Sequence, residues 1–265
     1  MHCQKSLACL GTLAVALCVE ALTFSLAASQ LRAQSIQVSL TFPPTQPRGA
    51  PPRTSGAGTR TGRNESENPT VCLTNNPPLT AVAPNNNVVT TVSGNPTLFW
   101  YVPKTQAKSA EFVLFDKVFD KEGEKFNEIY RTTVAVKGTP GIVKLSIPAS
   151  VSLERGKQYL WTFTVMCNSD FEEAPLVAGA IERTALNWME ERKLAAAKEP
   201  LEKAEVYAEA EVWQETLSLV AQLRYERPYD FRVNNAWREL LSSVQLGAIA
   251  SEPLVECCTV TQEMK

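Results

Sequence analysis

Apolar and polar positions alternate most regularly in the stretch QYLWTFTVM, residues 158–166. Every second residue in its centre is large and apolar, and these residues are Tyr159, Trp161, Phe163 and Val165. A period of two places alternate side chains on opposite faces of an extended chain. The pattern therefore predicts a strand with one strongly buried face.

A glycine, Gly156, lies shortly before this strand, which opens with Tyr159. A tyrosine that follows a glycine turn in this way is typical of the tyrosine corner of immunoglobulin-like sandwiches, in which its hydroxyl bonds backbone upstream. An antibody-type domain would have a cysteine two residues later, where this chain has Trp161. We therefore expect an immunoglobulin-like antiparallel β-sandwich without the antibody-type disulfide.

Further short stretches of strand character lie between about 71 and 183, each bounded by turn residues. They are PPLTAVAP (77–84), NVVTTV (87–92), PTLFWYVP (96–103), AEFVLFD (110–116), EIYRTTVAV (128–136) and GIVKLSI (141–147). Short strands at spacings of roughly ten residues predict a sandwich. The last two flank the turn sequence KGTPG, so we expect them to pair as a hairpin. The stretch 175–184 supplies either a closing strand or the start of a helix.

From about 184 the apolar residues recur at helical spacing. The clearest stripe comprises Val233, Trp237, Leu240, Leu241 and Val244. Residues 203–228 resemble one tetratricopeptide-type helical hairpin. A single unit of this kind cannot bury its own apolar face, so we expect it to pack on neighbouring helices or on the sandwich. The predicted fold class is α+β, with a β-sandwich domain (71–183), a small helical region (184–250) and a C-terminal tail (251–265).

The N-terminal segment predicts export. Lys5 is followed by an apolar run from Leu7 to Val19, and small residues after it offer cleavage points, as in a secretory signal peptide. We assign residues 1–33 to this signal. No later apolar run is long enough to cross a bilayer, so we expect a periplasmic or extracellular protein with no membrane span after cleavage.

Residues 34–70 are rich in Pro, Gly, Ser, Thr, Asn and Arg, and the stretch QPRGAPPRTSGAGTRTGRNE (46–65) has almost no apolar residue. This composition predicts a disordered or loosely attached leader. Four arginines make it locally basic: Arg48, Arg53, Arg60 and Arg63. They are candidate contacts for an anionic envelope polymer or an acidic partner, and the alternative is a solvated linker.

Cleavage after residue 33 would leave 24 basic against 27 acidic residues, a balance that gives no indication of nucleic-acid binding. It would also remove His2, the only histidine of the chain. The exported protein would then lack the residue required for Ser-His-Asp or Cys-His catalysis and for histidine-ligated zinc or haem. We expect no cofactor.

Four cysteines would remain after cleavage, namely Cys72, Cys167, Cys257 and Cys258. An even number in an exported protein suggests disulfides, and four cysteines allow three pairings. We favour Cys72 with Cys167, because each flanks the expected sandwich. Cys257 and Cys258 would then pair with each other or remain free.

Several motifs, in order, resemble those of a family of cyanobacterial exported proteins classed as a domain of unknown function, number 928 in its series. The motifs are RGAPPRTSGAGTRTG (48–62), LTAVAP, PTLFWYVP, AEFVLFD, GTPGIVKLSIP, L-x-x-GKQYLW and YAEAEVWQETL. The family has the same plan of an Arg/Gly-rich leader, a β domain and a helical tail. The resemblance implies no catalytic residue. The connection DKVFDKEGEKFNEIY is longer and more charged than the family pattern leads us to expect.

Two functions are compatible with these features. The first is a non-catalytic interaction module of the cell envelope, with Trp100 or Tyr101 as a candidate contact for a partner or a sugar. These two residues alternate along one strand, and the other interpretation places one in the core and one under the helices. The second function is a histidine-free hydrolase of envelope glycans that uses paired carboxylates. Its candidate residues are Asp116, Asp120, Asp170, Glu172 and Glu173.

Overall fold

The structure is a computed structural model that describes residues 39–44, 72–73, 76–84, 88–120, 123–167 and 174–256. All of them belong to one compact unit, Val38–Lys265. The predicted signal peptide, the four leader arginines, Cys257 and Cys258 lie outside the described residues, as do Asp170, Glu172 and Glu173. Within the described ranges, no helix combines the length and apolar character needed to cross a membrane.

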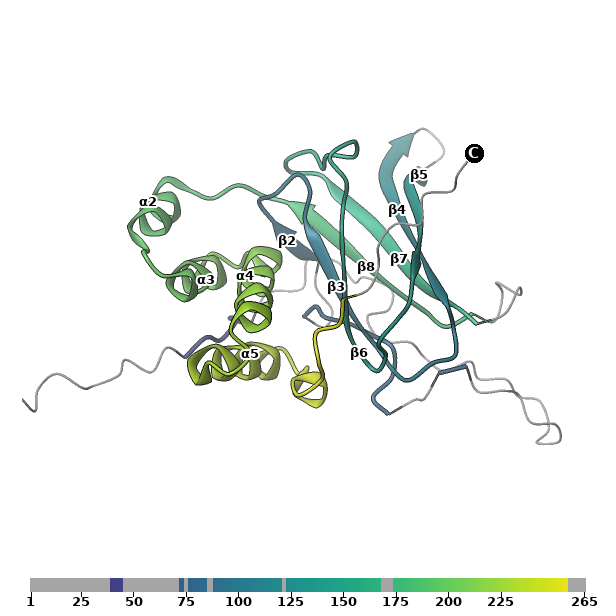
Figure 1. The fold of residues 1–265 in the computed structure, drawn as a ribbon. Coiled ribbons are helices and arrows are strands. Elements are labelled where there is room, and N and C mark those ends of the chain that lie inside the picture. Colours follow the sequence, from purple (N-terminus) through teal and green to yellow (C-terminus); the bar gives the residue numbers. More distant parts are fainter. Residues whose placement is uncertain are drawn as a thin grey trace, which may run out of the picture. The chain divides into compact units, whose positions relative to one another are not determined.

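The described residues form an α+β fold with two β-sheets followed by helices (Figure 1). The strands are β1 (Thr80–Ala81), β2 (Val89–Thr91), β3 (Thr97–Val102), β4 (Ser109–Asp120), β5 (Gly123–Ala135), β6 (Gly141–Ser146), β7 (Gln158–Met166) and β8 (Leu176–Arg183). One sheet has the order β1-β3-β6, and the other has the order β2-β8-β7-β4-β5. Neighbouring strands are antiparallel except for β2, which runs parallel to β8. The stretch at 175–184 is therefore a strand.

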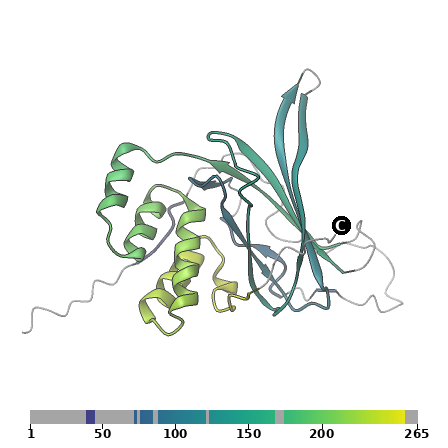
Figure 2. The same ribbon diagram turned by 45° about the horizontal axis from the view of Figure 1, so that its top comes forward.

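The predicted hairpin between 128–136 and 141–147 is wrong. The first of these segments belongs to β5, which pairs with β4, whereas the second is β6, which pairs with β3 in the other sheet. The reason lies in the charged connection DKVFDKEGEKFNEIY, which continues β4 and β5 as one long antiparallel pair. Because β5 is already paired with β4, it does not pair with β6. Figure 2 shows these two strands continuing beyond the rest of their sheet.

Aromatic side chains fill the space between the two sheets. Trp100 of β3 stacks on Phe163 of β7 with ring centroids 4.4 Å apart, and the rings of Trp161 and Phe112 lie 5.7 and 5.6 Å from it. Gly179 on β8 makes room for Trp161, because a Cβ at this position would lie 2.3 Å from the indole ring. The core therefore sits where β3 faces β7 and β4.

Two further contacts fix the edges of this domain. The Tyr159 hydroxyl accepts a hydrogen bond of 3.0 Å from the backbone N–H of Glu154, which is the upstream contact expected of a tyrosine corner. Cys72 and Cys167 form a disulfide with their Cα atoms 5.7 Å apart, the pairing favoured on sequence grounds. The two cysteines are 95 positions apart, and closing so long a loop stabilises a fold by about 4–5 kcal/mol in the loop-entropy description.

The helices are α2 (Trp188–Ala196), α3 (Pro200–Glu209), α4 (Trp213–Glu226), α5 (Phe231–Ser243) and the short 3₁₀ helix η1 (Gly247–Ile249). Asn187 caps α2 through its side chain, and Pro200 occupies the first turn of α3, where its missing N–H costs nothing. The predicted helical hairpin falls on α3 and α4. The predicted apolar stripe of 233–244 is buried along α5 and just beyond it.

The start of α4 joins the helices to the β-sheets. The Trp213 indole N–H donates a 3.0 Å hydrogen bond to the carbonyl of Val82. One carboxylate oxygen of Glu215, Oε1, accepts from the Thr91 hydroxyl at 2.7 Å and from the backbone N–H groups of Val92 and Ser93 at 3.1 and 3.0 Å. The expectation that the helical region packs on the β domain is therefore confirmed.

The prediction of a disordered leader over 34–70 is wrong for residues 39–44. The side chains of Leu40 and Phe42 are only 1% and 4% exposed, and their backbone N–H groups bond side chains of α5. Composition averaged over the leader hides a local alternation, because Ile36, Val38, Leu40 and Phe42 are apolar at every second position. That alternation is the sequence feature that indicates an ordered, half-buried segment.

Candidate binding pocket

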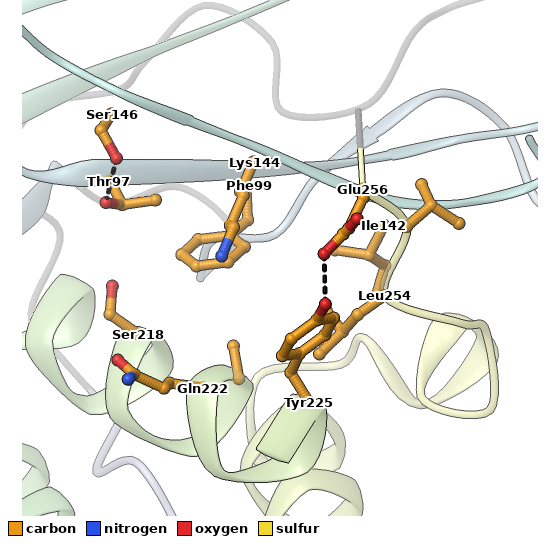
Figure 3. Close-up of a pocket in the computed structure, with 12 residues that line it drawn as sticks. Thr97, Phe99, Ile142, Lys144, Ser146, Ser218, Gln222, Tyr225, Leu254 and Glu256 are labelled. Atoms are coloured by element: carbon orange, nitrogen blue, oxygen red, sulfur yellow. Dashed lines mark hydrogen bonds between the residues drawn. The ribbon is translucent and has the colours of Figure 1, made fainter. Parts of the chain in front are cut away.

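A pocket of about 240 Å³ lies between helix α4 and the face of β3 and β6 that points away from the other sheet (Figure 3). Its polar lining residues are Thr97, Lys144, Ser146, Ser218, Gln222 and Glu256. Its apolar lining includes Phe99, Ile142, Ala221 and Leu254, with Tyr225 at the end of α4. The pocket therefore has an apolar floor with hydroxyl, amide and charged groups around it.

Strand alternation decides which residues of β3 and β6 reach the pocket. Thr97 pairs with Ser146 and Phe99 pairs with Lys144, so these four side chains share one face of the sheet. The residues between them, including Trp100, point to the opposite face and into the aromatic core. The Thr97 and Ser146 hydroxyls lie 2.8 Å apart in a hydrogen bond at one end of the pocket.

Helix α4 forms the opposite wall. Ser218, Ala221, Gln222 and Tyr225 follow the spacing i, i+3, i+4, i+7, which places them on one helix face. The same helix buries Leu217 and Val220 against the rest of the protein. A helix that packs through one face thus leaves an adjacent polar stripe along the pocket.

The residues after η1 close one end of the pocket. The Ile142 N–H donates to the carbonyl of Pro253 at 2.7 Å, and the Val255 N–H donates to the carbonyl of Ile142 at 2.9 Å. The segment thus runs along the free edge of β6. Gly141 permits this approach, because a Cβ there would lie 2.6 Å from the Val255 side chain. The described part of the predicted tail, 251–256, is consequently built into the sheet.

Two charged side chains of the pocket, Lys144 and Glu256, lie beside Tyr225. Glu256 accepts a hydrogen bond from the Tyr225 hydroxyl, and this bond raises the pKa of Tyr225 above its ordinary value. The Lys144 Nζ atom lies 6.0 Å from the centroid of the Tyr225 ring, within reach of a cation–π contact. Among the described residues, no carboxylate forms an ion pair with Lys144. Its ammonium is therefore available to an anionic ligand.

The two candidate contacts on β3 are not at the surface. Trp100 is 0% exposed in the core between the sheets, and Tyr101 is 2% exposed on the face toward the helices. Burial, followed by the nearby Glu252 carboxylate, raises the pKa of Tyr101. The prediction that either side chain contacts a partner is wrong, because each of the two strand faces is covered. The alternative interpretation, with one residue in the core and one under the helices, describes their positions.

Of the carboxylates proposed for a hydrolase, Asp116 is the one whose side chain the structure describes, and it does not line this pocket. Asp116 is bound by the Lys157 ammonium at 2.7 Å, and this hydrogen bond raises the pKa of Lys157. Within the part of the chain that the structure describes, Glu256 is the one carboxylate that lines the pocket. The same residues contain no group of three or more His, Cys, Asp or Glu side chains arranged to hold a metal ion.

The chain matches a known protein family. The family described as Domain of Unknown Function (DUF928) matches residues 55–254, which include the strands β1 to β8 and the helices α2 to α5. The chain belongs to the DUF928 family. Neither the curated proteins nor the solved structures contain a match to this DUF928 protein.

The residues of the pocket differ from those selected on sequence grounds. Lys144 and Ser146 alternate with apolar residues in GIVKLSI, a pattern that indicates a strand with one polar face. Nothing in that pattern shows that a helix of the DUF928 fold covers this face. Tyr225 and Glu256 are 31 positions apart, and their contact depends on where the last described residues run.

Proposed function

We propose that this DUF928 protein is an exported, non-catalytic interaction module of the cell envelope. The observation that carries the proposal is the composition of the pocket. An ammonium that has no ion-pair partner among the described residues, one carboxylate, hydroxyls and an amide surround an apolar and aromatic floor. Such a combination orients a ligand through a few polar contacts and buries one of its faces. Among the residues that the structure describes, the pocket lining has a single carboxylate, Glu256, whereas the hydrolase alternative requires a pair.

The chemistry of the pocket favours a ligand with an acidic group. Lys144 offers a charge-assisted hydrogen bond to a carboxylate or phosphate, and Tyr225 offers a partly exposed ring beside it. A volume of about 240 Å³ suits one sugar ring or one side chain rather than a larger ligand. We therefore propose that the partner is an anionic envelope polymer, or an envelope protein that presents an acidic side chain.

The predicted leader adds a second point of attachment to this proposal. Arg48, Arg53, Arg60 and Arg63 are followed within the chain by the folded unit, so a polymer bound by the arginines would be held near the pocket. Arginine suits bidentate contacts with carboxylate and phosphate groups. Export is supported by the signal-peptide pattern of residues 1–33, and a disulfide is common in proteins of oxidising compartments.

For the fold, we propose that the two sheets form an immunoglobulin-like sandwich. Three observations support an immunoglobulin-like sandwich: the order of the strands within the two sheets, the parallel pairing of β2 with β8, and the hydrogen bond to the Tyr159 hydroxyl. We also propose that α3 and α4 are a tetratricopeptide-like hairpin. Two consecutive, mutually packed helices at the predicted position support that assignment.

The test is cosedimentation of the purified protein with isolated envelope polymers that carry carboxylates or phosphates. Lys144→Gln should weaken binding about three- to tenfold, because it removes one charge-assisted contact. Lys198→Gln removes the same charge from an exposed position between α2 and α3 and should leave binding unchanged. Equal binding by the wild-type protein and the Lys144 variant would exclude the pocket.

A second arm separates the leader from the pocket. Replacing the four leader arginines with glutamine should weaken binding and reduce its dependence on salt, because Debye screening acts over roughly 8–10 Å near physiological ionic strength. The melting temperature of the folded unit should not change. Release of new reducing ends from the polymer during these incubations would contradict a non-catalytic role and favour the hydrolase.

A further inference from the structure

Residues 39–44 lie as an extended segment against helices α4 and α5, drawn in purple in Figures 1 and 2. The Leu40 N–H donates to the Glu239 carboxylate at 3.1 Å, and the Phe42 N–H donates to the Ser243 hydroxyl at 2.9 Å. The Phe42 ring meets the edge of the Trp213 ring with centroids 5.0 Å apart. The segment is part of neither sheet.

The spacing of these contacts follows from the geometry of the two elements. Leu40 and Phe42 are two residues apart in an extended chain, a distance of about 6.6–6.8 Å. Glu239 and Ser243 are four residues apart on α5, a rise of about 6 Å. Alternate backbone N–H groups of an extended peptide therefore meet polar side chains that lie one helical turn apart.

The same alternation sorts the side chains of the segment. Leu40 and Phe42 turn inward and are 1% and 4% exposed, whereas Ser39 and Thr41 are exposed. The helices thus recognise an extended backbone together with two apolar side chains at positions i and i+2. This is the arrangement of a peptide-binding groove, here filled by the chain's own segment.

We propose that this groove, formed by α4 and α5, also takes the segment Ser39–Pro44 of a second copy of the chain, so that two molecules exchange these segments. The occupant is a second copy because the one peptide sequence that the structure places in the groove is the chain's own. The groove lies on α5 and does not share the pocket beside β6, so the proposal does not depend on the proposed function.

The length of the intervening chain allows the exchange. Positions 45–71 separate the segment from Cys72, and this many residues can span up to about 90 Å when fully extended. The contacts within the groove are identical whether the segment comes from the same molecule or from another. The balance between them then depends on protein concentration and on the effective concentration set by the connection.

Complementation between two full-length variants tests the proposal. The donor carries Glu239→Arg and Ser243→Arg, which remove both side-chain acceptors of the segment's N–H groups and so weaken its binding to its own groove. The acceptor carries Leu40→Ser and Phe42→Ser, which leaves the groove empty. Each variant alone should be monomeric by light scattering, and an equimolar mixture should have the mass of two chains. Arg238→Ala and Thr41→Ser change exposed neighbouring positions and serve as controls that form no such pair.

Three other outcomes would contradict the proposed exchange of segments. If both variants are folded and their mixture stays monomeric, exchange between copies is excluded. If a synthetic peptide of residues 36–45 binds the acceptor although the mixture stays monomeric, the groove takes the free segment but not the segment of a second chain, and the proposal fails. If the acceptor does not fold, two fluorescently labelled pools of wild-type protein are mixed, and an absence of energy transfer after prolonged incubation overturns the proposal.

Discussion

The two interfaces built on the sheets use different interactions. Between the sheets, Trp100 and Trp161 contribute their rings, while their indole N–H groups have no hydrogen-bond partner among the described residues. At the helices, the indole N–H group of Trp213 donates to the carbonyl of Val82 at 3.0 Å, and the Glu215 carboxylate accepts hydrogen bonds from residues 91–93. The contact between the sheets therefore relies on packing, whereas the contact with the helices adds directed hydrogen bonds to packing.

This difference suggests that one interface mainly stabilises the fold and that the other mainly fixes the position of the helices. Packed aromatic rings stabilise a core in proportion to the apolar surface they bury and impose little orientation through their polar atoms. Hydrogen bonds to a buried carboxylate such as Glu215 contribute less net free energy, but leaving their donors unpaired is costly. We infer that the core sets most of the stability and that the joint at α4 sets how the helices sit over the pocket.

The largest expected effect comes from the core. Trp100→Ala should lower the free energy of unfolding by about 3–5 kcal/mol, because it leaves a cavity among three aromatic neighbours. Urea denaturation followed by tryptophan fluorescence or circular dichroism measures this loss. Trp188→Ala removes a side chain that is 65% exposed and should change stability by less than about 0.5 kcal/mol. Similar losses for both variants would show that the stacked core is not the main source of stability.

A smaller effect is expected at the joint. Glu215→Ala should cost about 2–3 kcal/mol, because the Thr91 hydroxyl and the N–H groups of Val92 and Ser93 lose their shared acceptor. Glu226→Ala, at the exposed end of the same helix, provides the control. Hydrogen exchange should detect faster opening around β2 in the Glu215 variant, while β7 stays protected. Uniform loss of protection across both regions would contradict a local role for Glu215.

The smallest effect is a dependence on pH. Burial raises the pKa of the Glu215 carboxyl above its ordinary value of 4.5, and the hydrogen bonds from Thr91, Ser93 and Val92 offset part of this shift. The folded state then holds the proton more tightly than the unfolded state does. The contribution of Glu215 to stability is accordingly complete below the unfolded pKa and declines as the pH rises through the raised, folded pKa.

Glu215→Gln isolates this dependence, because glutamine keeps an acceptor oxygen and does not titrate. Relative to this variant, the wild-type protein should become less stable as the pH rises from about 4 toward neutrality. Denaturation midpoints of both proteins across that range measure the difference. If the stability of the wild-type protein relative to the variant instead increased with pH, the hydrogen bonds to Glu215 would affect its pKa more than burial does, and the pKa would be lowered.

Local patterns predicted those parts of the fold whose partners are near in sequence or whose own periodicity is strong. The alternation around Trp161 and the glycine before Tyr159 predicted both β7 and the hydroxyl contact with Glu154. The turn sequence KGTPG was misleading, because a turn favours a hairpin only when the strands beside it are not already paired. Here β4 pairs with β5 over its whole length and leaves β6 to the other sheet.

Segments whose partners are distant in sequence could not be assigned in this way. Leu40 is 199 positions from Glu239, and averaged composition assigned its surroundings to a disordered leader. The pocket was missed for a related reason. The polar face of β6 was visible in the sequence at Lys144, but the helix that covers it and the residues that close it near Glu256 come from much later in the chain.

The bonds between Ile142 and the residues Pro253 and Val255 also constrain the order in which the protein can be assembled during synthesis. A ribosome releases the chain from its N-terminus, so β6 emerges more than a hundred residues before the segment that covers its edge. Until then, the backbone groups of that edge are open to pairing with other chains. The sheet β1-β3-β6 therefore reaches its final form only once the residues up to Val255 have been made.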